Sequence, residues 1–455
     1  MSGFSSLGIG ASALQAAQRG LELSGQNISN VNTAGYSRQR LDQVASGGSP
    51  VPAMYARSTG VGNGVLVLGT DRLRDEFLEA RAQQVRGSAS SVASTAATLG
   101  AIEGVFGEPS DTGLQAQMAS FWNSFGDVAN DPTSAAPRTQ VLEQAAQLAA
   151  TFGRTSQQLD TQWSGTRQAL DATVAQVNST ASDVARLNDA IRSAKVSGAS
   201  TNELSDQRDQ LVLKLGESIG AVGRLNDDGT VTVSVGGSQL VSGSRTSPLR
   251  VDGPTVPGQP GQVSVTWASS GTPATVTGGD VQGLTTALTA TIPGYRSALD
   301  AVAAQLANAV NSQQAAGYDR NGTQGAAIFS GTTAATLTVS MTATNGIAAS
   351  KAAPPAYDGD NAASMAGHLG DPRGADASYR SLIVGLGVQS QSASRQADIQ
   401  DVMLKQVDTA RLGVSSVSLD EEMTNLMSYQ HAYEAAARFV SVIDSTMDSL
   451  MNMAR

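Results

Sequence analysis

Residues 419–453 read LDEEMTNLMSYQHAYEAAARFVSVIDSTMDSLMNM, and this stretch decides the fold that the sequence predicts. Apolar side chains recur in it at spacings of three and four, which is the pattern of a coiled-coil seam. The row consists of Leu419, Leu426, Tyr429, Tyr433, Ala436, Val440, Ile443, Met447 and Leu450, and only Glu422 interrupts it. Because the chain stops at Arg455, we expect the partner helix to come from elsewhere in the chain or from another chain.

The first forty residues contain a matching helical pattern. Its apolar seam consists of Leu7, Leu14, Leu21 and Ile28, which recur every seven residues. Three arginines and one glutamate accompany this seam, whereas acidic residues dominate 419–453. Opposite charge along two matched seams favours their pairing. We therefore predict that the two ends of the chain pack together, and the alternative is two separate surface helices on one globular core.

Between these ends, helical patterns surround a β-rich stretch. A long helix is predicted over 71–106, with Phe77 among its core positions, and another over 139–196. In the second, Leu148, Leu159 and Leu170 lie eleven residues apart, a spacing that favours a nearly straight helix. Residues 223–283 alternate valines with turn signals and are predicted to be β. Helix is expected to return at Pro293.

The composition excludes several classes of protein. The net charge is −10 with a pI near 4.8, and no basic patch stands out, which disfavours nucleic-acid binding. There is no cysteine, which excludes disulfides, thiolate zinc sites and a cysteine nucleophile. No apolar run approaches the ~18 residues of a membrane span. The N-terminal stretch lacks the basic and densely apolar regions of a cleavable secretory signal.

No motif predicts catalysis, a cofactor or a metal. The two histidines, His368 and His431, are far apart in the sequence, and no cysteine accompanies them to complete a zinc site. Asp206, Arg208 and Asp209 are close together on a predicted helix. Charges on such a helix are expected to be solvated or to pair locally, rather than to form a catalytic cluster.

Two short loops imitate binding motifs. Residues 60–64, GVGNG, precede a predicted strand instead of a helix, so we predict a hairpin or strand-entry turn rather than a phosphate loop. Residues 319–322, DRNG, lack acidic ligands downstream, so we predict a turn rather than a calcium site.

Both ends of the chain resemble signatures of one known family. Residues 24–40, SGQNISNVNTAGYSRQR, and residues 418–453 are similar to the terminal signatures of the bacterial flagellar axial proteins, which comprise rod, hook and hook-associated proteins. Similarity to the hook-associated branch continues through GNGVLVLGTDRLRDEF (62–77), FWNSFGDVANDPTSAAPR (121–138), LSDQRDQL (204–211) and GVSSVSLDEEM (413–423).

This resemblance implies a nested, multi-domain and mainly α fold with a small inserted β domain. Residues 1–45 and 414–455 would form a terminal coiled-coil domain. Residues 46–222 and 284–413 would form a helical middle domain, of which 330–377 is irregular with short strands. Residues 223–283 would form the inserted β domain, pointing outward.

The resemblance also implies a structural role without enzymatic turnover. The chain would form a junction ring between hook and filament, outside the cell, and would be exported without a cleaved signal peptide. Its partners would be further copies of itself, the hook protein, a second junction protein and an export chaperone that binds the C-terminal helix. The alternatives are another axial component, such as a hook or distal-rod protein, and a secreted adhesin or wall-degrading enzyme with axial-type ends.

We predict the assembly interface at the two ends. It comprises Leu7, Leu14, Leu21, Ile28, Asn30, Asn32, Gly35, Tyr36, Leu419, Leu426, Tyr429, Tyr433, Val440, Ile443, Met447 and Leu450. In a single chain these side chains have little neighbouring surface, and each fully buried apolar side chain contributes about 1.5–3 kcal/mol. The ends are therefore expected to be mobile in a monomer and to become ordered when neighbouring subunits bury them.

Overall fold

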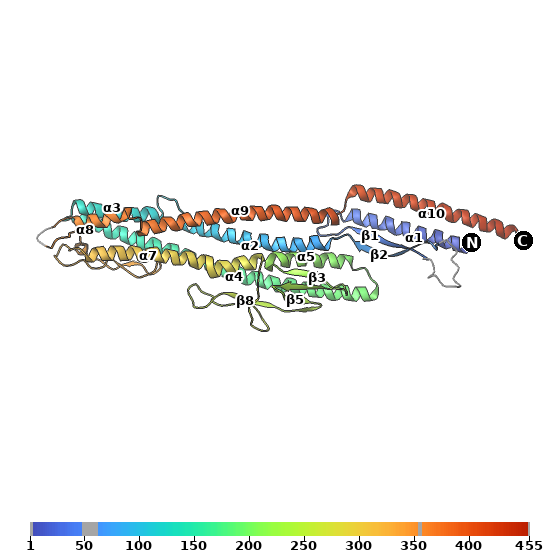
Figure 1. Cartoon of the computed structure of the whole chain (residues 1–455), viewed down its shortest axis with the longest axis horizontal. Helices are drawn as coiled ribbons and strands as arrows, with labels where there is room; N and C mark the ends of the chain where they lie inside the picture. Colours follow the sequence, from blue (N-terminus) through green and yellow to red (C-terminus); the bar gives the residue numbers. More distant parts are fainter. Residues whose placement is uncertain (1–2, 48–61, 354–356, 454–455) are drawn as a thin grey trace, which may run out of the picture.

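A computed structural model describes residues 3–47, 62–353 and 357–453 of the chain. Long helices run side by side and give the molecule the shape of a rod (Figure 1). The α-helices are α1 (Gly3–Ser29), α2 (Glu76–Phe106), α3 (Leu114–Asn130), α4 (Ala135–Ser197), α5 (Asn202–Ile219), α6 (Gly279–Thr286), α7 (Ile292–Ala315), α8 (Asp360–Ala366), α9 (Ala375–Ser415) and α10 (Leu419–Met453). The strands are β1 (Gln39–Ala45), β2 (Val65–Arg72), β3 (Val222–Leu225), β4 (Val231–Val235), β5 (Ser238–Ser242), β6 (Arg245–Thr246), β7 (Leu249–Asp252), β8 (Ser264–Trp267), β9 (Phe329–Ser330) and β10 (Thr338–Val339). The predicted fold class, mainly α with a small inserted β region, is confirmed.

Helix α4 is the longest helix of the described chain, and the other elements of the rod pack along it. Leu148, Leu159 and Leu170, spaced by eleven residues, are completely buried along it. The helix stops where Gly198 adopts a left-handed φ of 74°, at which its N–H reaches back to Ala194 O. Glycine tolerates this conformation best, so its position sets the end of the helix.

The core of the rod contains a cluster of aromatic side chains on α3. Phe121, Trp122 and Phe125 are buried, and the ring centroid of Phe121 lies 5.1 Å from that of Trp122 and 5.3 Å from that of Phe125. The Trp122 indole N–H donates a 2.7 Å hydrogen bond to Asp376 at the start of α9. Burial raises the pKa of Asp376 above its usual value, and the bond from Trp122 only partly opposes this shift. The pair fixes the N-terminal end of α9 against α3.

The inserted strands lie along α4 and share its core. Strands β3, β4, β5 and β6 form an antiparallel sheet in that order, and β7 pairs with β8. The Asn188 amide on α4 donates to Val231 O at 2.8 Å and accepts from Val231 N at 2.9 Å. The side chains of Val233 and Leu240 belong to the same hydrophobic cluster as the helices. The strands therefore have no separate core of their own.

Two local expectations are wrong. Helix returns at Gly279 instead of Pro293, because α6 and a π-helical turn over Ala287–Thr291 come before α7. Phe77, predicted to be a core residue, is 71% exposed. The segment before it is strand β2, so α2 begins only at Glu76, behind an Asp75 cap whose carboxylate accepts from Phe77 N and Leu78 N.

The two ends of the chain meet at one end of the rod (Figure 1). Helix α9 runs back along the rod, and the helical structure is interrupted at residues 416–418 before α10 begins. Helix α10 then lies beside α1 in the opposite direction. We call these two helices the terminal pair, and the rest of the rod beyond the β1–β2 hairpin the body.

Candidate functional site

The terminal pair is built on close contact at two glycines. A Cβ atom at Gly20 would lie 2.5 Å from the ring of Tyr429, and one at Gly10 would lie 2.6 Å from Val440. The absence of a side chain at these positions lets the α10 residues lie directly against the backbone of α1. The small residues of the N-terminal stretch therefore determine how closely the helices approach.

The seam between these helices is only partly buried. Most of the predicted seam residues on both helices are half-buried, namely Leu7, Leu14, Leu21, Ile28, Leu426, Tyr429, Val440, Ile443 and Met447. Leu419, Tyr433 and Leu450 are exposed. Full burial is limited to a few smaller or inner positions, such as Ala16, Leu23 and Ala436. One chain alone thus does not complete its own seam.

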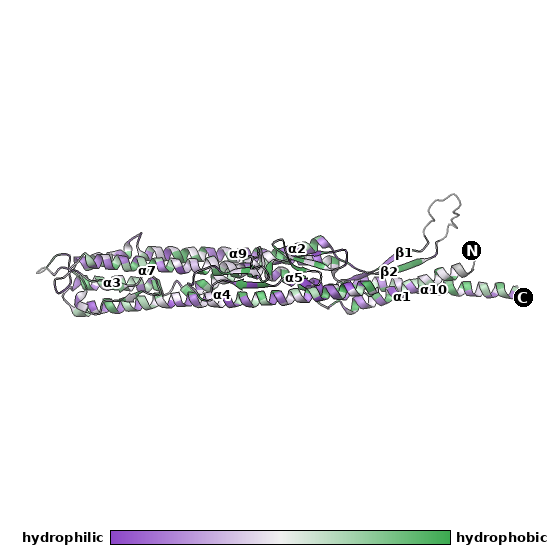
Figure 2. Cartoon of the chain, turned by 90° about the horizontal axis from the view of Figure 1, so that it is seen from below, coloured by the Kyte–Doolittle hydropathy of each residue, from purple (hydrophilic) through white to green (hydrophobic). Residues whose placement is uncertain are grey.

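Helix α10, which is coloured as hydrophobic over many of its residues in Figure 2, carries a larger set of exposed apolar side chains. They are Leu419, Met423, Met427, Tyr433, Phe439, Val442, Leu450, Met451 and Met453. A helix turns about 100° per residue, which puts Met423 on one side of the seam and Phe439 on the other. An exposed apolar surface of this extent is typical of a protein interaction site.

The Asn-rich signature forms the turn that connects α1 to β1. The Asn27 amide donates to Gln39 O at 3.0 Å, and its oxygen accepts from Gln39 N at 3.1 Å and from the Tyr36 hydroxyl at 2.8 Å. The Asn30 amide donates to Gln26 O at the end of α1. Sequence reasoning did not single out Asn27, although the reversal of the chain after α1 depends on it.

The other predicted residues of the signature lie on the same turn. Gly35 has a φ of 78°, and a Cβ atom there would overlap the Gln210 side chain of α5. Burial, followed by the nearby Asp206 carboxylate, raises the pKa of Tyr36 to about 12. Asn32 is exposed. In the single chain, Gly35 and Tyr36 thus hold the turn against the body, and their role as assembly contacts remains a prediction.

An ionic network, which we call the joint, holds the β1–β2 hairpin on α5. Arg72 of β2 binds Asp206 and Asp209 of α5, each at 2.8 Å, and Arg74 also pairs with Asp209. The Asp206 carboxylate accepts a further bond from Ser37 N at 3.1 Å. The expectation that these α5 charges are solvated or pair locally is therefore wrong for the two aspartates, while Arg208 does pair locally with Asp209. The main partner of both aspartates is Arg72 of the hairpin, more than 130 positions earlier in the chain.

Arg208 completes the joint from inside. Its side chain is 1% exposed, donates to Gly229 O at 2.6 Å and pairs with Asp209. Burial lowers the pKa of Arg208, while Asp209 opposes that shift. A buried ionic network of this kind fixes geometry more than it adds stability, because the loss of hydration offsets much of the attraction.

Arg38 links the joint to the terminal pair. Its backbone N–H donates to Ser415 O at 2.8 Å, at the end of α9, and its guanidinium binds Glu421 and Glu422 on α10. Although burial opposes its charged form, the bonds to these two carboxylates raise the pKa of Arg38. The residue directly before β1 therefore holds both α9 and α10, on either side of the interruption between these helices.

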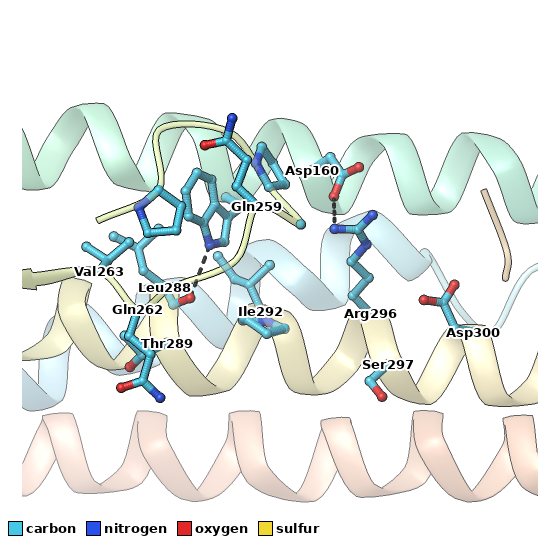
Figure 3. A pocket seen from close by; sticks show the side chains of 16 residues that line it. Asp160, Gln259, Gln262, Val263, Leu288, Thr289, Ile292, Arg296, Ser297 and Asp300 are labelled. Atoms are coloured by element: carbon cyan, nitrogen blue, oxygen red, sulfur yellow. Dashed lines mark hydrogen bonds and ion pairs between the residues drawn. The ribbon is translucent and has the colours of Figure 1, made fainter. Parts of the chain in front are cut away.

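A pocket of about 480 Å³ lies between α4, α7 and the proline-rich loop after β7 (Figure 3). Trp163 donates to Leu288 O at 3.1 Å beneath the loop, and Asp160 pairs with Arg296 at 3.1 Å. Burial raises the pKa of Asp160. These contacts join α4 to the π-helical turn and to α7 beneath the loop.

The remaining polar motifs are structural. Within the described residues, no three His, Asp or Glu side chains are grouped so that they could hold a metal ion. His368 lies with its ring centroid 5.4 Å from that of Trp122, and His431 is exposed. Asp319 accepts from Asn321 N and Thr323 N, which confirms the predicted turn. Of the 60–64 loop, residues 62–64 lead into β2, and the others lie outside the described residues.

Comparison with known proteins shows what the chain is similar to. A family model described as the flagellar hook-associated protein FlgK helical domain matches residues 99–329. A second model, described as the flagellar basal body rod FlgEFG protein C-terminal region, matches residues 410–453. The second match falls on the end of α9 and on α10, the helix with the exposed apolar surface.

Two relatives carry the name flagellar hook-associated protein 1. The protein of Bacillus subtilis is 30% identical over 97% of this chain and 96% of its own length. The protein of Salmonella typhimurium is 31% identical over 70% of this chain, and the match spans only 58% of that longer relative. The solved structure of the flagellar hook junction protein FlgK from Burkholderia pseudomallei superposes with a TM-score of 0.65 at 16% identity, covering 75% of this chain and all of that one. That superposition shows a shared fold.

Proposed function

Because the chain belongs to the family of flagellar hook-associated protein 1, we propose that it is a structural protein that joins hook and filament in the bacterial flagellum. In this function it polymerises through its terminal helices into a ring. It performs no catalysis, and its work consists of packing against neighbouring subunits.

The observation that carries this proposal is the incomplete burial of the terminal pair. Its seam residues are half-buried and α10 exposes apolar side chains on two sides, so neighbouring copies can contact each pair on both flanks. Each side chain that becomes fully buried adds about 1.5–3 kcal/mol to assembly. The terminal helices are therefore loosely held in a free chain and become ordered in the ring.

The joint determines how the body is oriented on the assembled pair. Arg38 binds both sides of the break between α9 and α10, and Arg72 and Arg74 hold the hairpin on α5. When the terminal pair is fixed by its neighbours, these contacts transmit its orientation to the body. All bodies in the ring then point in one direction.

A position at the junction between hook and filament implies which partners the chain has. They are identical subunits, the hook protein on one side and a second junction protein on the other. An export chaperone that keeps α10 covered before assembly would bind its apolar surface. The ring lies outside the cell, and export uses no cleaved signal peptide. No helix in the described part of the chain is long and apolar enough to cross a membrane.

The alternatives have less support. The helical-domain match over 99–329 favours a hook-associated protein over a hook or distal-rod protein. A wall-degrading enzyme would need a catalytic group, and degradation of purified peptidoglycan by the pure protein would be the observation in its favour.

Deletion of the gene tests the proposal. Cells that lack the protein should assemble hooks of normal length yet release flagellin into the medium, because filament subunits have nothing to attach to. Expression of the intact chain should restore attached filaments. Attached filaments in the deletion strain would refute the function, and so would the absence of hooks, which would indicate an earlier component.

A further inference from the structure

The outward face of α9 has an apolar stripe that no described residue of the chain covers. Val384, Val388, Ile399 and Val402 are each about 60% exposed or more. They recur at spacings of three and four around Gln391 and Arg395, as in a coiled-coil seam. The opposite face of α9 already packs on the body through buried residues.

The residue type of this stripe argues for burial in another molecule. All four exposed side chains are β-branched, and such residues are poorer helix formers than the straight-chain residues that would suit a solvated face. Exposed apolar side chains gathered on one face of a helix are typical of an interaction site.

A groove lies between α2 and β3. It consists of two cavities of about 1030 Å³ and about 460 Å³ that share Ala80 and Val222 as lining residues. Phe77, Val222 and Leu225 line it with exposed apolar side chains. The larger cavity is also lined by charged residues, among them Arg72, Arg74 and Asp209 of the joint. Helix α9 and strand β3 contact α2 from opposite sides (Figure 1).

We propose that the α9 stripe of one copy packs into the α2–β3 groove of the next copy. A helix that lays an apolar face into a groove is a common mode of recognition. Because stripe and groove are different surfaces of one chain, the contact is heterologous and repeats around a ring. This inference rests on the proposed function and adds a contact between bodies to the one between terminal pairs.

The charges of the two surfaces match. In the described part of the chain, Arg81 and Arg224 of the groove have no carboxylate partner, and Asp398 of the stripe has no cationic one. Conversely, Arg395 of the stripe is unpaired, and so is Glu76 of the groove. Docking can pair Asp398 with Arg81 or Arg224, and Arg395 with Glu76.

Site-specific photocrosslinking in intact flagella tests the contact. Ile399 is replaced by p-benzoylphenylalanine, the cells are irradiated, and the partner peptide is identified by mass spectrometry. The expected product is a dimer of this chain with the crosslink at residues 72–88 or 222–225. Gln168, an exposed residue of α4, serves as the control position and should give no such dimer.

The outcomes separate this inference from the proposed function. An incorporated Ile399 probe that crosslinks to hook protein, to a different segment of this chain or to nothing overturns the α9 contact, while the junction role stands. Failure of the unsubstituted chain to be found at the hook–filament junction overturns both.

A second variant does not depend on the crosslinking chemistry. Val388→Lys with Ile399→Lys should leave the unfolding temperature of the free chain within about 2 °C, because both side chains are exposed. It should reduce attached filaments several-fold, whereas Gln168→Lys should not. Normal filament attachment in the double variant would contradict the proposal.

Discussion

Arg38 and Glu422, 384 positions apart in the sequence, meet in a 2.7 Å hydrogen bond between Nε and Oε1. Glu422 is 2% exposed, although it is the charged residue that interrupts the apolar row of α10. The interruption is therefore a specific contact between the two ends of the chain. It occurs where α10 begins, and it ties that helix to the segment that leads into β1.

Arg38→Ala should make local opening easier where β1 and α10 meet, next to the joint. Glu422 would remain buried without its partner, which costs about 2–3 kcal/mol. The free energy of local opening, measured by amide exchange at residues 37–41 and 419–425, should fall by that amount. Replacing both partners, as in Arg38→Met with Glu422→Leu, should recover most of the loss. Unchanged exchange in Arg38→Ala would show that the pair does not hold the ends.

Gly20→Ala should disrupt the terminal pair, because the new Cβ atom would meet the Tyr429 ring at 2.5 Å. The temperature at which the chain is released from isolated flagella should drop. Gly25 is the matched control, since a Cβ atom there meets nothing within 4 Å. Gly25→Ala improves helix propensity by about 1 kcal/mol and should not lower the release temperature. Equal behaviour of the two variants would contradict close packing at Gly20.

Leu426→Asp with Val440→Asp should abolish assembly and leave the body folded. Both side chains lie on the half-buried seam, where two new carboxylates would prevent packing. Circular dichroism should show an unchanged main unfolding transition, while filaments detach. Thr424→Asp with Ser445→Asp adds the same charge on exposed positions of α10 opposite the seam and should preserve attachment. Normal attachment in the seam variant would count decisively against the seam.

Asp376→Asn should make the body more stable at neutral pH. Burial raises the pKa of Asp376, so the folded chain holds this proton more tightly than the unfolded chain does. The destabilisation by the ionised carboxylate is complete above the folded pKa and disappears as the pH falls below the unfolded pKa of about 3.9. The asparagine oxygen can still accept from Trp122. Urea unfolding should therefore show a gain at pH 7 that shrinks towards pH 4, and a constant difference would contradict this account.

The sequence predicts what depends on local periodicity. The seams of α1 and α10, the buried rows of α4 and the position of the β insertion all follow from spacings of two, three, four or eleven residues. Helix α6 was not expected because its Gly- and Thr-rich sequence has low helix propensity and forms a helix only by packing on α2 and α5.

The joint could not be predicted because its partners are distant in the sequence. Asp206, Arg208 and Asp209 have the spacing of surface charges on a helix, and nothing local shows that Arg72 and Arg74 will cover them. Asn27 and Glu422 are similar cases, since each binds a backbone or side chain that only the fold brings near. The quoted signatures contain these residues, but the roles of the residues appear only in three dimensions.

The central claim is that neighbouring copies complete the terminal pair. Amide hydrogen exchange tests it most directly when a verified monomer is compared with the same chain in isolated flagella. We predict that amides of residues 7–25 and 426–450 exchange far faster than those of α4 in the monomer, and that they become protected in the assembled state. Strong protection of both segments in the free monomer would contradict the claim that neighbouring copies complete the terminal pair.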